Sequence, residues 1–435
     1  MITSTAFAGK HYAVLGLARS GLASVEALLA SGAKVTAWDS DPDRVQYFRS
    51  SRAKSRGVGA GERPSTSLGT NGLVFANLDE ADLTQFDALV LSPGIPLNRH
   101  PIVPRAREAG VEVIGDIELF ARARPELPPH KVVGITGTNG KSTTTALVHH
   151  ILQTAGVPSL MGGNIGLPIL AQDPLPEGGV YVLELSSYQI DLTKSLDCDV
   201  AVLLNITPDH LDRYDGFEAY MASKLRLFEM QSSGKIGLDV SPPKNYRASR
   251  DDYLLRNQKT WPALQGKHNA RNALAAIQSC RGVGIGDEAI AEALGTYPGL
   301  PHRMERIREK DGIMFVNDSK ATNATATAPA LAAFPAIRWI LGGQAKLDNL
   351  DECAPHFSHV RKAYTIGDAS GLFAGLLKPH MPVAECGTLD VAVTAAAGDA
   401  QAGDTVLLSP ACASFDQFKD FEARGDHFRD LVQAL

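Results

Sequence analysis

The sequence predicts an α/β protein built on parallel sheets with helices on both faces. Short runs rich in Val, Ile and Leu alternate along the chain with segments of helical length. Nearly continuous apolar strands that alternate with helices are typical of parallel sheets buried on both faces. The chain has 435 residues, of which 44% are hydrophobic, whereas single cores stop growing near about 250 to 300 residues. More than one domain is therefore expected.

The predicted strands also suggest where the domains divide. In chain order they are HYAVLGL, AKVTAWD, ALVLSPGI, KVVGITG, VYVLELSS, VAVLLNIT, MFVNDS, RWILGG and TVLLSPA. Two Pro-containing joints, RARPELPPHK and TYPGLPHRME, interrupt this series. We expect domains at residues 1–119, 120–301 and 302–435. Ligands of such sheets bind beyond the carboxyl ends of the strands, so functional side chains should directly follow the strands.

Composition narrows the class of partner. The formal net charge of -6 gives no general attraction to nucleic acid or anionic lipid, so small molecules are the expected partners. The N-terminus lacks a signal-peptide pattern, and no run of about 18 apolar residues occurs, which predicts a soluble cytoplasmic protein. The 5 cysteines are scattered, which indicates buried small residues and no disulfide framework or zinc site. Residues 49–72, rich in Gly, Ser and Arg, are predicted to be a surface insertion.

The stretch GITGTNGKSTTT, residues 134–145, places glycines, a lysine and hydroxyls between a strand and a helix. It departs from the common P-loop pattern G-x-x-x-x-G-K-[ST], because Ile135 occupies the first glycine position. The glycines still allow close backbone approach, and the helix N-terminus favours phosphate. The alternative is a glycine turn before an ordinary helix. The residues predicted to bind ATP here are Gly137, Thr138, Asn139, Gly140, Lys141, Ser142 and Thr143.

Two further loops of the central domain carry polar side chains after strands. Glu184 ends the strand in VYVLELSS, where an acidic metal ligand is expected, although it could instead cap a helix. Asp209, His210 and Asp212 follow the next strand in LLNITPDHLDRY. Oxygen and imidazole groups suit Mg²⁺ or an anionic substrate, but a single histidine could equally be structural.

The first domain contains a weak nucleotide-binding signal. In VLGLARSG, Gly16 and Gly21 frame a strand-to-helix turn, and Asp39 ends the following strand. The pattern is similar to a dinucleotide fingerprint in which Ala18 replaces the middle glycine. An NAD-dependent dehydrogenase is therefore one alternative, and a nucleotide-gated switch, based on the phosphate loop alone, is another.

The motifs GTNGKST, NITPDHLDRY, GKHNARNALAA and LPHR, in this order, resemble the Mur ligases and their folate-conjugating relatives, which are ATP-dependent enzymes that form amide bonds. VNDSKATN and LLSPACASFDQFKDFEARG resemble the family members that add D-glutamate. The resemblance implies an N-terminal Rossmann-like domain, a central P-loop ATPase-like domain with a parallel sheet and a C-terminal Rossmann-like domain. A different acceptor amino acid, or folate, is the alternative within the family.

The resemblance also implies a reaction in peptidoglycan precursor synthesis, carried out by a cytoplasmic monomer. The γ-phosphate of ATP would pass to the terminal carboxylate of UDP-N-acetylmuramoyl-L-alanine, and the amine of D-glutamate would attack the acyl phosphate. Two Mg²⁺ ions would be required, and CO₂ would form a carbamate on Lys224. From the residues alone, Lys224 is only a cation on a helix.

The implied sites divide by ligand. The catalytic residues would be Lys141, Glu184, His210 and Lys224. The metal would be held by Ser142, Glu184, His210 and the Lys224 carbamate. The remainder of the ATP site would consist of Asn269, Asn272, Arg303 and Asp318. The UDP-substrate would contact Arg19, Ser20, Asp39, Ser40, Gly94, Asn164 and His210, and Asn164 could instead belong to the metal shell. The D-glutamate carboxylates would be bound through Lys320, Thr322, Lys346, Ser414 and Phe421.

Some local features qualify these assignments. Two lysines with nearby hydroxyls suit a dicarboxylate on chemical grounds. Phe415, Phe418 and Phe421 follow helical spacing, so most of this stripe is predicted to be core. The family often has a cation where this chain has Asp41, which leaves the uridine end open. The segment between Lys224 and residue 266 is shorter than is usual in the family.

Overall fold

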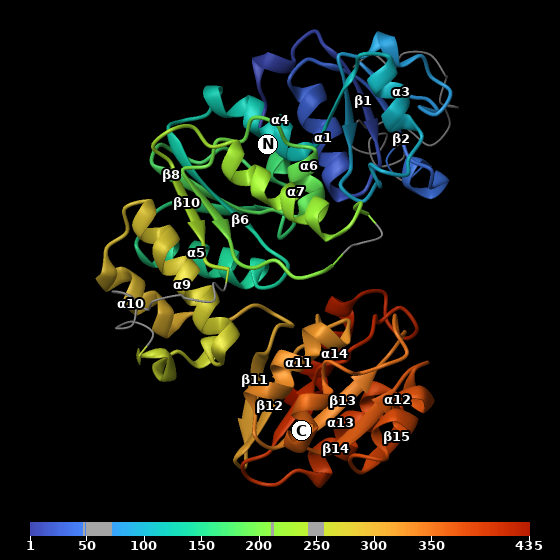
Figure 1. Ribbon diagram of the computed structural model, residues 1–435, viewed down its shortest axis with the longest axis vertical. Coiled ribbons are helices and arrows are strands. Elements are labelled where there is room, and N and C mark those ends of the chain that lie inside the picture. Colours follow the sequence, from blue (N-terminus) through green and yellow to red (C-terminus); the bar gives the residue numbers. More distant parts are fainter. Residues whose placement is uncertain (47, 49–71, 210–212, 242–255) are drawn as a thin grey trace. The chain divides into compact units, whose positions relative to one another are not determined.

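The structure is a computed structural model that describes the chain except residues 47, 49–71, 210–212 and 242–255 (Figure 1). Nearly all of the predicted insertion at residues 49–72 lies outside the described residues. The described parts contain three sheets, each covered by helices. Within them, no helix combines the length and the hydropathy needed to cross a membrane.

The chain forms two compact units. The first comprises Met1–Ser249 and Arg271–Ala293, and the second comprises Arg250–Ala270 and Leu294–Leu435. Two of the sheets belong to the first unit and the third sheet belongs to the second. The predicted α/β class with three sheet-based domains is confirmed, while the boundaries after residues 119 and 301 stay predictions.

The N-terminal sheet has the strand order β3-β2-β1-β4-β5, with all strands parallel. Its strands are β1 (His11–Leu15), β2 (Lys34–Trp38), β3 (Leu73–Phe75), β4 (Ala88–Leu91) and β5 (Glu112–Ile114). Its helices are η1 (Thr5–Phe7), α1 (Arg19–Ala30), η2 (Leu83–Gln85), α3 (Ile102–Glu108), α4 (Asp116–Ala123) and η3 (Arg124–Glu126). β1 and β4 are buried along nearly their whole length, as expected for central strands covered on both faces.

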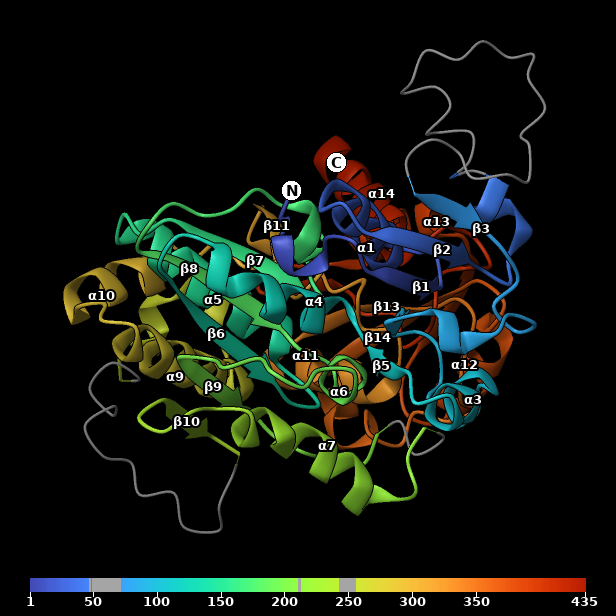
Figure 2. The ribbon, with the colours of Figure 1, turned by 90° about the horizontal axis from the view of Figure 1, so that it is seen from above.

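The middle sheet is also parallel and has the order β10-β9-β6-β8-β7. Its strands are β6 (His130–Thr136), β7 (Ser159–Gly163), β8 (Gly179–Glu184), β9 (Val200–Leu203) and β10 (Ile236–Asp239). The helices that follow these strands are α5 (Lys141–Thr154), η4 (Ile169–Ala171), α6 (Ser187–Asp191) and α7 (Phe217–Glu229). Helix α5 lies across β6 and β8 and packs on β7 and β8 (Figure 2). Next along the chain come η5 (Gln258–Thr260), η6 (Pro262–Leu264), α9 (Lys267–Gly282) and α10 (Asp287–Thr296).

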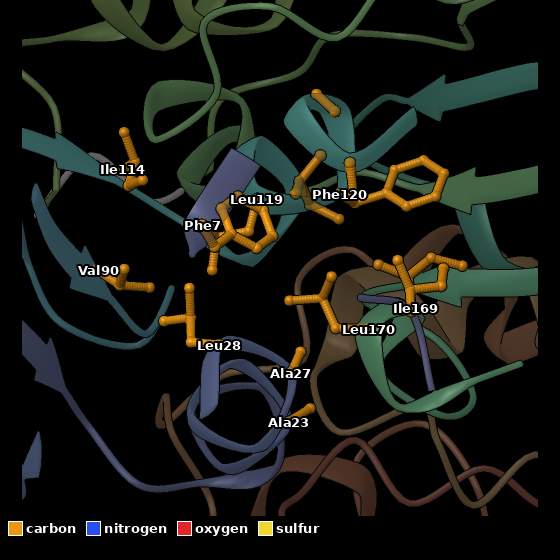
Figure 3. Packing of buried hydrophobic residues seen from close by; sticks show 14 of the residues in the cluster. Phe7, Ala23, Ala27, Leu28, Val90, Ile114, Leu119, Phe120, Ile169 and Leu170 are labelled. Carbon is orange, nitrogen blue, oxygen red and sulfur yellow. The ribbon is translucent and has the colours of Figure 1, made fainter. Parts of the chain in front are cut away.

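One hydrophobic core joins these two sheets into a single unit. Leu28 of α1, Phe120 of α4 and Ile169 of η4 are fully buried in the same cluster (Figure 3). The same core extends to Tyr181 of β8, whose ring contacts Phe120 edge-to-face. Burying each large apolar side chain contributes about 1.5 to 3 kcal/mol, so this shared core fixes the N-terminal sheet against the middle sheet.

The C-terminal sheet has the order β11-β12-β16-β13-β14-β15. Its strands are β11 (Glu305–Lys310), β12 (Ile313–Asn317), β13 (Ile337–Gly342), β14 (Val360–Ile366), β15 (Val383–Gly387) and β16 (Thr405–Leu408). Its helices are α11 (Ala324–Ala333), η7 (Ala354–His359), α12 (Ser370–Leu377), α13 (Leu389–Asp399) and α14 (Phe421–Ala434). All strands run parallel except β11, which pairs antiparallel with β12.

Two sequence-based expectations need correction. The sheets are not wholly parallel, because edge strand β11 turns back on β12 through a tight turn that contains Gly312 at φ 75°. The predicted phenylalanine stripe is also wrong: α14 begins at Phe421, and Phe415 lies before it with 68% of its surface exposed. A hydrogen-bonded loop precedes α14, so the spacing of these rings does not reflect a helix.

Candidate active site

The loop between β6 and α5 has the backbone that the sequence predicts for a phosphate cradle. Gly140 caps α5 in the left-handed region, at φ 87°. A Cβ atom at Gly140 would lie 2.3 Å from Oδ1 of Asn272. The close contact with Asn272 and the left-handed backbone therefore both favour glycine at this position. The first turn of α5 then presents backbone N–H groups and a partial positive charge to an anion. The contact also places Asn272, a predicted ATP-binding residue, beside the loop.

Asn205, which follows β9, holds the phosphate loop in shape. Its Oδ1 accepts from the Asn139 N–H at 2.9 Å, and its Nδ2 donates to the Asn139 carbonyl at 2.9 Å. Its own carbonyl accepts from the Thr138 N–H at 3.0 Å. Sequence reasoning missed Asn205, although its place at a strand end in LLNIT was a usable signal.

Two lysine side chains share the first carbonyl of this loop. Lys141 Nζ donates to the Gly137 and Thr138 carbonyls at 2.9 and 2.8 Å. Lys224 Nζ, reaching across from α7, donates to the same Gly137 carbonyl at 3.0 Å. Tyr220, one turn before Lys224, places its hydroxyl 3.1 Å from Thr138 Oγ1 and its ring 4.7 Å from Lys224 Nζ. Helix α7 thus contacts the loop through two side chains, those of Tyr220 and Lys224.

Lys224 is a buried amine, with 1% of its surface exposed, so the alternative of a cation on the helix surface is wrong. Burial, together with the nearby charge of Lys141, lowers the pKa of Lys224 to about 7. Asp209 and Asp191 oppose this shift without cancelling it. A large fraction of Lys224 is therefore neutral near neutral pH, which is the form that reacts with CO₂.

Glu184 ends β8 with a carboxylate that is 2% exposed. Its Oε1 accepts from Asn164 Nδ2 at 3.1 Å, while its Oε2 is buried with no hydrogen-bond partner. The helix-capping alternative is wrong, because Ser186 caps α6 in a capping box with Gln189. A buried, unpartnered carboxylate oxygen is costly unless it binds a cation, so Glu184 fits the predicted role of Mg²⁺ ligand.

The topology brings these loops to one edge of the middle sheet. β6 lies between β8 and β9, and all three run parallel, so Lys141, Glu184 and Asp209 follow neighbouring carboxyl ends. Ser142 is buried in the first turn of α5. The predicted ligand His210 and its neighbour Asp212 lie outside the described residues. Among the residues that are described, His, Cys, Asp and Glu form no group of three that could hold a metal.

Asp39 stabilises the strand-to-helix turn between β1 and α1. Asp39 Oδ2 accepts from the Leu17 N–H at 2.6 Å, which ties the end of β2 to the turn before α1. Arg44 pairs with Asp39 at 3.5 Å and with Asp41 at 3.3 Å. Arg44 therefore supplies a cation beside Asp39, at the predicted uridine end, where sequence reasoning saw only Asp41. Arg19 and Ser40, also predicted to bind the UDP-substrate, are exposed beside this turn, and Ser20 is half-buried.

Of the remaining UDP-substrate residues, Gly94 follows β4 of the N-terminal sheet and Asn164 follows β7 of the middle sheet. Gly94, after β4, accepts a hydrogen bond of 2.8 Å from Arg213 Nη2, and the Arg213 guanidinium lies 4.8 Å from the Tyr188 ring. Arg213 belongs to the segment after β9, so it links the predicted sugar contact to the loops at the carboxyl ends of the middle sheet. Asn164 lies beside Glu184, the predicted metal ligand, which favours the metal shell over the muramoyl substrate for its predicted role.

Three predicted ATP contacts belong to the second compact unit. Asn269 donates from Nδ2 to the Gln265 carbonyl at 3.1 Å. Asp318 is buried and accepts from Ser409 Oγ at 2.7 Å. Burial raises the pKa of Asp318 to about 7, although the charge of Arg303 and the Ser409 hydroxyl oppose the shift.

The predicted D-glutamate residues gather after neighbouring strands of the C-terminal sheet. Lys320 and Thr322 follow β12, Ser414 follows β16, and Lys346 follows β13, and these strands are adjacent in the order β12-β16-β13. Lys346 is exposed and Ser414 is buried. Lys320 Nζ lies 4.8 Å from the centre of the Phe421 ring. One edge of this sheet thus carries both lysines and the hydroxyls that would recognise a dicarboxylate.

Three family models match the chain, one on each sheet. They describe a MurD-like N-terminal domain of Mur ligases at residues 10–115, the Mur ligase middle domain at residues 135–246 and the Mur ligase glutamate ligase domain at residues 302–412. The matches cover the phosphate loop, Glu184, Lys224 and the segments after β12 and β13.

Named relatives match over the whole length of the chain. The UDP-N-acetylmuramoylalanine–D-glutamate ligase of Novosphingobium aromaticivorans is 57% identical and covers 100% of this chain and 97% of its own. That of Zymomonas mobilis is 54% identical and covers 100% of both chains. Among solved structures, the UDP-N-acetylmuramate-alanine ligase MurC of Thermotoga maritima aligns over 98% of this chain and 99% of its own, with TM-score 0.54 and 15% identity. FolC of E. coli aligns over 74% of this chain and 93% of its own, with TM-score 0.51 and 19% identity.

Proposed function

Because the chain belongs to the Mur ligase family, we propose that it joins D-glutamate to UDP-N-acetylmuramoyl-L-alanine in an ATP-dependent step of peptidoglycan precursor synthesis. The observation that carries this proposal is the 57% identity, over the full chain, to a relative named for that reaction. The phosphate loop with its buried lysine and carboxylate supports the same chemistry. The dehydrogenase, the nucleotide switch and a different acceptor within the family are the less supported alternatives.

The reaction proceeds in two chemical steps. The terminal carboxylate of the UDP-substrate attacks the γ-phosphorus of ATP, the bond to the β-phosphate oxygen breaks, and ADP leaves. The amine of D-glutamate then attacks the carbonyl carbon of the acyl phosphate. The tetrahedral adduct loses a proton and phosphate and collapses to the amide. The two steps together have lower barriers than direct amide formation. A carboxylate resists attack by an amine, whereas an acyl phosphate carries phosphate as a good leaving group.

The phosphate loop contributes positioning and charge. In the structure, the Lys141 ammonium group donates to the loop carbonyls of Gly137 and Thr138. When ATP is present, it would turn to the β- and γ-phosphate oxygens. The N–H groups at the start of α5 would face the same phosphates. Phosphoryl transfer depends mainly on such positioning and charge neutralisation. Asn205 and Tyr220 keep the loop rigid while Lys141 moves.

Glu184, Ser142, His210 and a carbamate on Lys224 would hold two Mg²⁺ ions. Bound Mg²⁺ would neutralise the charge that develops on the transferred phosphoryl group. Two observations support the fit, namely the unpartnered Oε2 of Glu184 and the buried Lys224 amine. A carbamate would exchange a cation for an anionic oxygen ligand of the kind that Mg²⁺ prefers.

The C-terminal unit would select the acceptor. Lys320 and Lys346 would pair with the two carboxylates of D-glutamate, and Thr322 and Ser414 would add hydroxyl donors. The aromatic ring of Phe421 would pack beside the Lys320 ammonium and limit its movement. The proposed enzyme acts in the cytoplasm, as a monomer, on ATP and a UDP-linked substrate.

Phosphate release from ATP tests the proposed function. The assay contains Mg²⁺ and UDP-N-acetylmuramoyl-L-alanine, with D-glutamate, L-glutamate, L-lysine, glycine or no amino acid added separately. We expect release only with D-glutamate, accompanied by a product heavier by one glutamate residue. Release with another amino acid would overturn the acceptor assignment, and release that does not require the UDP-substrate would overturn the ligase reaction.

A further inference from the structure

We propose that Arg424 is the positioning residue that sets the mutual spacing of the three loops of the D-glutamate site. The proposal rests on the function proposed above. Arg424 lies in the first turn of α14, and only 1% of its surface is exposed. It is among the largest fully buried side chains, yet it belongs to neither the ATP site nor the acceptor contacts.

The guanidinium of Arg424 donates to all three loops. Nε donates to Ser319 Oγ at 3.0 Å, and Nη2 donates to the Ser319 carbonyl at 2.8 Å. Nη2 also reaches the Cys412 carbonyl at 3.1 Å. Nη1 reaches the carbonyls of Ala413 at 3.3 Å and Gly342 at 3.5 Å. These acceptors follow or end β12, β16 and β13, which are distant in sequence but adjacent in the sheet.

Each of these loops carries a predicted D-glutamate contact close to an Arg424 acceptor. Ser319 directly precedes Lys320, and Ala413 directly precedes Ser414. The loop from Gly342 continues to Lys346. A displacement of any of these loops would separate the two ammonium groups from the hydroxyls that must bind the same small dicarboxylate. Misplacement by about 1 Å is enough to impair such a site.

Ser319 extends the connection to the helix itself. Its hydroxyl donates to the Phe421 carbonyl at 2.8 Å while accepting from Arg424 Nε. Phe421 and Arg424 are three residues apart in α14, so they occupy the same side of the helix. The Phe421 ring in turn lies against the Lys320 ammonium. One guanidinium therefore organises both the loop backbone and the aromatic contact.

The charge of Arg424 is not compensated by an ion pair. Within the described residues, no carboxylate lies at ion-pair distance from its guanidinium, and its acceptors are carbonyls and one hydroxyl. Burial lowers the pKa of Arg424 to about 10, which still leaves it charged at neutral pH. A buried, unpaired cation is costly for folding. A planar fork of five donors can join three loops in a way that lysine, with three donors on one atom, cannot.

Enzyme kinetics on Arg424→Ala test the proposal. We expect the KM for D-glutamate to rise about 10- to 100-fold, as for the loss of charged hydrogen bonds, with the KM for UDP-N-acetylmuramoyl-L-alanine changed less than about twofold. Added methylguanidinium should lower the D-glutamate KM again, whereas methylammonium should not. Arg338→Ala is the matched control, because Arg338 is an arginine of β13 paired with Asp404 at the opposite end of that strand.

Amide hydrogen exchange of the free protein provides a readout that needs no reaction. Arg424→Ala should speed exchange together in residues 319–323, 342–346 and 411–415 while strands β13 and β16 stay protected. Ser319→Ala, a milder change that retains the guanidinium, should raise the D-glutamate KM severalfold. Unchanged exchange in the three loops, equal rises of every KM, or failure of methylguanidinium to rescue would overturn the role. A wild-type protein that ignores D-glutamate would overturn the proposed function, and the exchange result would still decide the role of Arg424.

Discussion

Asp116 provides a sharp test of the energetics in the first unit. It begins α4, is 3% exposed, and neither of its carboxylate oxygens has a hydrogen-bond partner. Burial raises the pKa of Asp116 from 3.8 to about 6, and weaker interactions with the Ile117 N–H and the Gln189 side chain oppose the shift. At one pKa unit per 1.36 kcal/mol, the charged form costs about 3 kcal/mol relative to the unfolded chain.

The sign of the pH dependence follows from this raised pKa. Between pH 3.8 and about 6 the folded chain binds more protons than the unfolded chain, so stability falls as pH rises through this window. Asp116→Asn removes the ionisation and keeps the shape. We expect the variant to be more stable than the wild type by up to about 3 kcal/mol at pH 8 and by roughly half of that at pH 5.

Urea unfolding at pH 5 and pH 8, followed by circular dichroism, measures this difference. The matched control is Glu118→Gln on the same helix, because Glu118 accepts from the Lys194 and Ser195 N–H groups at 2.7 and 2.9 Å and from Arg122 at 2.9 Å. That control should be destabilised at both pH values. An Asp116→Asn variant that is less stable than the wild type at pH 8, or a difference that does not change with pH, would refute the reasoning.

Three further predictions concern the phosphate loop. Lys141→Ala should lower kcat by about 10² to 10⁵, because a main transition-state charge is lost, and near-normal turnover would show that the loop is not the ATP cradle. Lys224→Ala should be weakly active and partly rescued by added small carboxylates that replace the carbamate, whereas full activity without rescue would exclude a ligand role. Gly140→Ala should raise the KM for ATP and lower stability by at least about 1 kcal/mol, because the new Cβ would meet Asn272 in a left-handed backbone. Equilibrium ATP binding and thermal unfolding check this last variant, and unchanged values for both would contradict the contact.

Much of the fold could be predicted from the sequence, because the strands that were predicted consist mostly of apolar residues. The central strands β1, β6, β8 and β16 are of this kind. Among the described strands, the predictions missed β14 and the edge strands β3, β5, β7, β10, β11 and β15. Strands β11 and β15, for example, mix charged with apolar residues, so their burial pattern carries little signal. The shared core around Phe120 could not be read from the chain, because it forms between elements far apart in sequence.

The candidate site likewise contains some residues that could be predicted from the sequence and others that could not. Gly140, Lys141 and Glu184 were recognisable because local chemistry and their place after a strand both pointed to phosphate and metal. The burial of Lys224 and the roles of Asn205 and Arg424 depend on contacts between distant segments. An amide or guanidinium that holds a loop in place has no short motif of its own.

The acyl-phosphate route can be tested by following oxygen. The donor UDP-N-acetylmuramoyl-L-alanine is prepared with ¹⁸O in its terminal carboxylate, and the phosphate released with ATP, Mg²⁺ and D-glutamate is analysed by mass spectrometry. If the γ-phosphate passes to that carboxylate, one labelled oxygen appears in the released phosphate and the other remains in the new amide. Unlabelled phosphate formed alongside the amide product would contradict the central claim.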